Sequence, residues 1–212
     1  MGSQSNGSTN LPSNELSHEG HSGWTIKNAP DMTPARSGLY ESTVSWLNFY
    51  NPDVILLMIG TNDINRNYLV STAPDRLDQL ISLIVATKPK ATLIVGNLTP
   101  IDPSNTYAID TNSDTREIAF NAAIPGLVQK HHDVLGQKVY FCDLNSKLTL
   151  ADLSDGLHPS QAGYNKMGDA WYAAIQAVPE PSVLALFLSG CTCLGGAYIR
   201  RRRRDADCRV SA

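Results

Sequence analysis

Three short apolar runs, separated by segments with helical spacing, constrain the fold of this chain most strongly. The clearest run covers residues 53–59, is followed directly by Gly60, and is typical of a strand buried on both faces of a sheet. Residues 91–98 and 138–144 predict two more strands. Helices are expected at residues 37–50, 74–87, 114–132 and 160–177. Pro125 should interrupt or kink the third helix. The alternation predicts an α/β domain with a three-layer parallel sheet and helices on both faces.

Charge is distributed unevenly along the 212 residues, whose formal net charge is −3. Six arginines and two aspartates follow Val183, so the preceding residues are more acidic than the total. Nucleic-acid binding relies on Lys and Arg against phosphate, so we expect no nucleic-acid partner. The four cysteines predict no disulfide framework, and Cys142 is interpreted as a small buried apolar residue of a strand.

Polar residues follow the first predicted strand directly, as Gly60-Thr61-Asn62-Asp63. Reactive groups gather at the carboxyl ends of the strands in parallel sheets. Taken alone the motif is weak, because Gly, Asn and Asp are common turn residues. Its position after a strand favours a functional role, and an Asn amide is a suitable hydrogen-bond donor to a developing oxyanion.

Two further motifs flank this one in the sequence. Residues 18–25 read His-Glu-Gly-His-Ser-Gly-Trp-Thr, which alone would be interpreted as a glycine-rich turn. Its two histidines and Glu19 could imitate a metal cluster, but no further ligand has convincing spacing. Asp155 and His158 are three residues apart, so the carboxylate can lie beside the imidazole in a short loop. Both could instead be ordinary loop residues.

The three motifs, in this order, resemble signature blocks of the SGNH/GDSL hydrolases, a family of serine esterases. Residues 3–24 are similar to carbohydrate-esterase-like members such as acetylxylan esterases. The resemblance implies the flavodoxin-like SGNH fold for residues 1–177. It also implies that Gly23 and Asn62 form the oxyanion hole, supported by Gly60 and Asp63.

The same resemblance assigns the proton-transfer residues. His158 would act as general base and then general acid, and Asp155 would fix its tautomer. No metal and no organic cofactor is expected.

The family also needs a nucleophilic serine in a Gly-Asp-Ser motif, which this sequence does not contain. Ser8, Ser13, Ser17 and Ser22 lack the supporting context that an activated hydroxyl needs. No residue of this sequence is therefore predicted to be the nucleophile. We expect the first block, together with the first strand of the sheet, to lie upstream of Met1. An unpaired sheet edge should then be exposed.

The C-terminal segment carries a second resemblance. A Pro-Glu-Pro linker at residues 178–182 is followed by an apolar run and five consecutive arginines, at residues 183–204. The run is just long enough to span a bilayer as a helix, and the arginines would hold its end in the cytoplasm. This order resembles the PEP-CTERM sorting signal, which implies an exosortase-type processing enzyme and the bacterial inner membrane as partners. A plain membrane anchor is the alternative.

These features predict an exported serine esterase, anchored transiently or stably in the inner membrane before reaching the cell surface. A signal peptide is expected upstream, because residues 2–8 are polar. The expected substrates are small esters or acetyl groups on polysaccharides, with lipid esters as the main rival. The alternatives are a catalytically inactive glycan-binding module on the same fold and a non-functional remnant.

Overall fold

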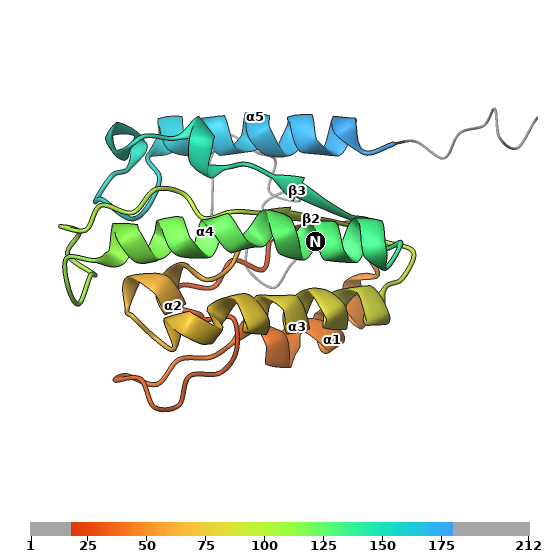
Figure 1. Cartoon of the computed structure of the whole chain (residues 1–212), viewed down its shortest axis with the longest axis horizontal. Helices are drawn as coiled ribbons and strands as arrows, with labels where there is room; N and C mark the ends of the chain where they lie inside the picture. Colours follow the sequence, from red (N-terminus) through yellow and green to blue (C-terminus); the bar gives the residue numbers. More distant parts are fainter. Residues whose placement is uncertain (1–17, 180–212) are drawn as a thin grey trace, which may run out of the picture. The chain divides into compact units, whose positions relative to one another are not determined.

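The computed structural model describes residues 18–179 of the chain (Figure 1). Its main elements are α1 (Leu39–Tyr50), β1 (Val54–Leu57), α2 (Thr61–Asn65), α3 (Ala73–Thr87), β2 (Thr92–Gly96), α4 (Ser113–Gln129), β3 (Val139–Cys142) and α5 (Gln161–Ala177). Short helical turns lie at Val70–Thr72, Lys130–Val134, Asn145–Lys147 and Leu150–Asp152. The strands pair in the order β1-β2-β3, and both pairings are parallel. The predicted α/β architecture with a parallel sheet and helices is therefore confirmed.

Alternate residues of the central strand β2 face two different helical layers. Leu93 and Val95 join the core formed with α1, α3 and α4, which contains Leu80 and Ile124. Gly96 instead faces α5, where a Cβ atom would lie 2.7 Å from the Trp171 ring. Figure 1 shows α5 and α3 on opposite sides of the sheet. Glycine at this position lets α5 approach the sheet closely.

The first strand differs from its prediction, because only one of its faces is covered. Leu57 is 5% exposed and joins the core beside α3, whereas Val54 and Leu56 are 46% and 44% exposed. β1 is an edge strand of the sheet in residues 18–179. The apolar sequence of this strand indicates that both faces are suited to burial. None of the described helices covers the face that carries Val54 and Leu56.

The third predicted helix is not interrupted at Pro125, where an interruption or a kink is expected from the sequence. Helix α4 runs through Pro125 from Ser113 to Gln129 and continues as a π-helical turn at Lys130–Val134. Ile124 and Val128 bury the face of this helix that packs against the core. Tertiary packing therefore outweighs the loss of one backbone donor at the proline, and the helix is not interrupted.

The interpretation of Cys142 as a small buried residue of a strand is confirmed. Cys142 lies in β3 and is 4% exposed, and burial raises the pKa of its thiol to about 11. His131 is buried, with Nδ1 2.6 Å from Gln137 Oε1 and Nε2 2.8 Å from Asp78 Oδ1, as expected of a structural histidine.

The membrane-spanning segment expected at residues 183–204 lies outside the described residues, as do residues 180–182 of the linker before it. Within residues 18–179, every helix is too short or too polar to cross a bilayer.

Candidate active site

The turn after β1 places the Gly60–Asp63 motif at the carboxyl end of the sheet. Gly60 caps α2 with φ of 118°, a conformation that glycine adopts without steric cost. A Cβ atom at this position would also lie 2.9 Å from the Phe120 ring. Both constraints require glycine here, and the sharp turn directs Asn62 and Asp63 away from the strand in the first turn of the helix.

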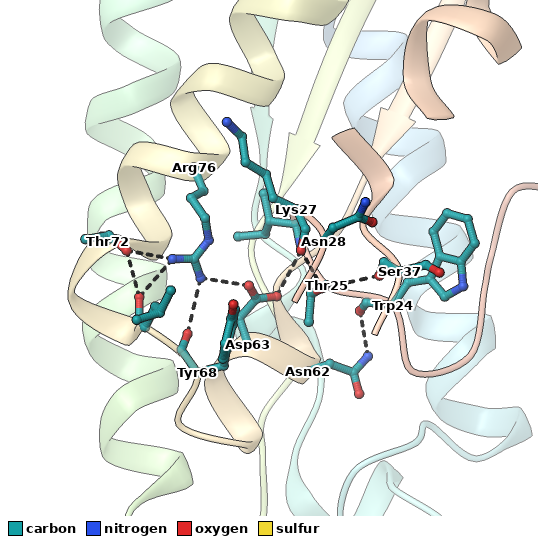
Figure 2. A network of polar contacts seen from close by, with 12 residues as sticks. Trp24, Thr25, Lys27, Asn28, Ser37, Asn62, Asp63, Tyr68, Thr72 and Arg76 are labelled. Atoms are coloured by element: carbon teal, nitrogen blue, oxygen red, sulfur yellow. Dashed lines mark hydrogen bonds and ion pairs between the residues drawn. The ribbon is translucent and has the colours of Figure 1, made fainter. Parts of the chain in front are cut away.

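The two residues predicted to form the oxyanion hole are linked through the backbone. Asn62 donates a hydrogen bond from Nδ2 to the Trp24 carbonyl, 2.8 Å away, and Trp24 follows Gly23 directly (Figure 2). Gly23 has φ of 78°. Within residues 18–179 the Gly23 N–H makes no hydrogen bond, and one N–H of the Asn62 amide also stays without a partner. Two donors on adjoining segments are therefore available to a ligand.

Asp63 anchors this turn from behind through a buried ion pair. Its carboxylate accepts hydrogen bonds from Arg76 Nη2 at 2.8 Å and from the Ile26 backbone N–H at 3.1 Å (Figure 2). The Arg76 fork also donates to the carbonyls of Tyr68 and Leu69. Burial raises the pKa of the Asp63 carboxyl, and the Arg76 guanidinium opposes that shift.

The network has a direct structural consequence. Ile26 lies just after the Gly23–Trp24 segment, while Asp63 lies just after Asn62, so one carboxylate holds the backbones of both oxyanion segments. Arg76 fixes that carboxylate from α3. Asp63 thus holds the turn from behind, and it does not line the cavity described below.

His158 and Asp155 meet in the loop before α5. His158 Nδ1 lies 2.8 Å from Asp155 Oδ2, and the other carboxylate oxygen accepts the backbone N–H groups of Leu157 and His158 at 3.0 and 2.7 Å. Desolvation raises the pKa of Asp155, but these hydrogen bonds outweigh it and hold the pKa at about 2. The ionised carboxylate accepts the Nδ1 proton, so Nε2 of the neutral ring is free to accept a proton.

A cavity of about 1110 Å³ brings these groups together. Gly23, Gly60, Asn62 and His158 all line it, although they come from three segments far apart in the sequence. Tyr107 also lines the cavity and packs edge-on against His158, with ring centroids 5.2 Å apart. The loop that carries Tyr107 has no sequence motif that would have identified it.

Sequence reasoning also missed three arginines near this site. Arg76 could have been identified most easily from the sequence, because its charged side chain interrupts the apolar face formed by Ala73, Leu77 and Leu80 of α3. Arg36 and Arg66 line the cavity and have no such sequence signal.

The histidines of the first motif make local contacts. The ring of His21 stacks on Trp24 and Trp46, with centroid separations of 4.1 and 5.0 Å, and its Nε2 lies 2.8 Å from Glu19 Oε2. His18 Nδ1 accepts the Gly20 N–H. In residues 18–179 no three His, Cys, Asp or Glu side chains are grouped so that they could hold a metal ion.

The structure thus brings a His–Asp pair and two unoccupied donors to one cavity at the carboxyl edge of a parallel sheet. Residues 6–166 match the model of the GDSL-like Lipase/Acylhydrolase family. The chain therefore belongs to this family.

Individual relatives are carbohydrate esterases or contain esterase domains. A Clostridium thermocellum family 3 carbohydrate esterase is 35% identical, with a TM-score of 0.63 over 82% of this chain and 74% of that chain. A family 3 carbohydrate esterase from Talaromyces cellulolyticus, 24% identical with a TM-score of 0.62, shares the fold over 84% of this chain and 82% of its own. A multidomain esterase of Ruminococcus flavefaciens is 29% identical over 169 residues, 78% of this chain. This chain spans only 21% of that protein.

Proposed function

We propose that this domain hydrolyses carboxylic esters by serine chemistry, with acetyl groups on a polysaccharide as its substrate. The observation that carries the proposal is the His158–Asp155 pair, 2.8 Å apart, facing the same cavity as the two free donors at Gly23 and Asn62. The identity to a carbohydrate esterase supports the polysaccharide substrate. Small esters and lipid esters would be hydrolysed by the same chemistry, and the assay described below distinguishes these substrates from acetylated polysaccharide.

In the proposed reaction, His158 Nε2 removes the proton of a serine hydroxyl while that oxygen attacks the ester carbonyl. The carbonyl oxygen becomes an oxyanion held by the Gly23 N–H and the Asn62 amide. The imidazolium, stabilised by the Asp155 carboxylate, then protonates the departing alcohol. Water repeats the cycle on the acyl-enzyme and releases the acid, which regenerates the serine and neutral His158.

The attacking serine is proposed to lie on a strand that adds to the open edge of β1, in a segment that the printed sequence does not contain. The absence of a Gly-Asp-Ser motif from the 212 residues supports this placement. So does the exposure of Val54 and Leu56, because apolar side chains on an edge strand are suited to cover by a further element.

We also propose that the protein is exported and that an exosortase-type enzyme at the inner membrane processes its C-terminal segment. This proposal rests on the sequence of residues 178–204 alone. It places the esterase where extracellular polysaccharides are accessible. Loss of the tail from the mature protein, measured by mass spectrometry of the secreted form, would support it, and an intact tail on cytoplasmic protein would contradict it.

The test of the proposed function begins with the coding DNA upstream of the Met1 codon. The complete reading frame is expressed, and acetate release is measured from acetylated xylan, a small acetyl ester and a lipid ester. A fluorophosphonate reagent, which labels activated serines, identifies the nucleophile by peptide mapping. We expect labelling of a Gly-Asp-Ser serine and acetate release from xylan.

A second function, glycan binding without catalysis, is favoured by one observation, the missing nucleophile. A stop codon directly upstream, no labelled serine, no acetate release and retained binding of xylan oligosaccharides would together replace the esterase proposal with the binding module.

A further inference from the structure

The four arginines of residues 18–179 fall into two pairs with opposite environments. Arg76 and Arg116 form ion pairs with Asp63 and Asp110, each at 2.8 Å. The remaining two, Arg36 and Arg66, make no side-chain hydrogen bond and no ion pair with the described part of the chain. These two are also the ones that line the active-site cavity.

Arg36 lies against the first oxyanion donor. A backbone bridge between Ala29 and Arg36, with N···O distances of 2.9 and 3.0 Å, fixes the end of its loop. A Cβ atom on Gly23 would lie 2.3 Å from Arg36 Nη1, so the guanidinium packs directly on the glycine. The Nε atom of Arg36 is buried and has no hydrogen-bond partner. A cationic fork therefore lies beside the Gly23 N–H.

Arg66 lies beside the second donor. It ends the short helix α2, and its backbone N–H donates to the Asn62 carbonyl at 3.2 Å. Residues four apart on a helical turn share a face, so the Arg66 side chain is on the same side as the Asn62 amide. Its Nε atom is also buried without a partner. Each of the two candidate oxyanion donors thus has an unpaired arginine next to it.

Among the described residues that line the cavity, no carboxylate pairs with either guanidinium. Glu19 is the only carboxylate in that described lining, and it contacts His21. A partly buried guanidinium without a partner is unfavourable, and in a chain of net negative charge aspartates were available to pair with it. Arginine forks match the two oxygens of a carboxylate in a bidentate geometry. The arrangement is therefore suited to an anionic ligand.

We propose that the cavity binds a carbohydrate that carries a carboxylate near the ester, such as an acylated uronic-acid unit. Arg36 and Arg66 bind that carboxylate and so determine the specificity. This inference rests on the proposed function, which supplies the reason that an ester would bind in this cavity. Binding of the sugar itself needs no serine, so it can be measured separately from catalysis.

The experiment measures binding of oligosaccharides without acyl groups to the full chain by titration calorimetry. The ligands are a galacturonic-acid trimer, a neutral xylose trimer and a sulfated xylose trimer with the same charge as the galacturonic-acid trimer. We expect the galacturonic-acid trimer to bind at least ~10-fold more tightly than the neutral trimer, with an affinity that falls as salt rises. Equal or stronger binding of the sulfated trimer would contradict carboxylate recognition.

Variants connect this binding to the two arginines. R36Q and R66Q should each weaken binding of the acidic trimer by ~10-fold or more, while neither changes binding of the neutral trimer. K90Q removes the same charge from an exposed position outside the cavity and should leave both affinities unchanged. R66K, which keeps the charge and loses the fork, should fall between R66Q and the unchanged protein.

Two results would overturn the inference. They are equal affinity for the acidic and neutral trimers, and unchanged binding in both glutamine variants with their thermal transitions intact. Acidic-trimer binding with no acetate release by the protein from the complete reading frame would instead contradict only the esterase proposal. Acetate release by that protein without any preference for the acidic trimer would contradict only the inference.

Discussion

Two acid–base pairs flank the same end of the sheet, and they differ in how completely they are enclosed. In the Asp63–Arg76 pair the side chains are 0% and 11% exposed, whereas in the Asp155–His158 pair they are 32% and 53% exposed. The first pair also makes hydrogen bonds to three backbone groups around it. The second leaves His158 Nε2 open to the cavity.

Under the proposed function, this difference separates a residue pair that holds the site from one that would react in it. A buried charge that loses its partner is strongly destabilising, because desolvation is then uncompensated. An exposed pair contributes little to stability but can exchange protons with a ligand. The comparison predicts that substitutions in the first pair change the free energy of unfolding, and that substitutions in the second change the reaction rate.

Replacing His158 should give the largest effect of all. In the protein from the complete reading frame, H158A should lower kcat/KM for ester hydrolysis by ~10³-fold or more, because it removes the general base. The free energy of unfolding should change by less than about 0.5 kcal/mol, since the ring is half exposed. H132A, at the opposite end of α4 from the cavity, is the matched control. Near-normal hydrolysis by H158A would remove this residue from the mechanism.

Breaking the buried pair should give the reverse pattern. R76M leaves Asp63 buried without its partner and should lower the free energy of unfolding by about 3–5 kcal/mol in urea titrations. K130M, which removes a half-exposed partner of Asp78, should cost less than about 1 kcal/mol. Combining R76M with D63N removes the unpaired charge and should restore part of the loss. Equal stability of R76M and K130M would show that enclosure is not what distinguishes the pairs.

Asn62 combines features of both pairs. It precedes Asp63 of the buried pair in the same turn, and in the proposed reaction it acts together with His158. N62A should lower kcat by roughly 10²–10³-fold with little change in KM, since the amide binds the oxyanion mainly in the transition state. The lost bond to the Trp24 carbonyl should cost only about 1 kcal/mol of unfolding free energy. N165A, on an exposed surface of α5, is the control. Steady-state kinetics that changed only in KM would contradict an oxyanion role.

Much of this arrangement could be predicted from local sequence. The spacing of apolar residues located all three strands and the four long helices, because buried stripes repeat with a fixed period. Asp155 and His158 could be paired in advance, since three residues of loop bring them together. The Gly60–Asp63 turn followed from its place after a strand. Each of these features depends on neighbours in the chain.

What could not be predicted depends on contacts between distant segments. The partner of Asp63 is 13 residues away on another helix, and the carbonyl that binds Asn62 is 38 residues away. The exposure of Val54 and Leu56 depends on which elements cover β1, which an apolar pattern cannot report. The same applies to the unpaired state of Arg36 and Arg66, because a lone arginine gives no sign of where its charge is balanced.

The smallest effect concerns the pH dependence of stability, where the two aspartates should differ in sign. The pKa of Asp155 is about 2 in the folded chain, below the ordinary value of 3.8. Its carboxylate therefore stabilises the fold above pH 3.8, and this contribution disappears as the pH falls towards 2. Burial raises the pKa of Asp63, so ionisation of that carboxyl opposes folding as the pH rises.

Urea titrations at pH 5, 4, 3 and 2 should show wild type more stable than D155N at pH 5, by less than about 1 kcal/mol because the side chain is a third exposed. Most of the difference should be lost by pH 2. For D63N the difference from wild type should move in the opposite direction over the same range, and a parallel course for the two variants would mean that the enclosed and open pairs do not differ electrostatically.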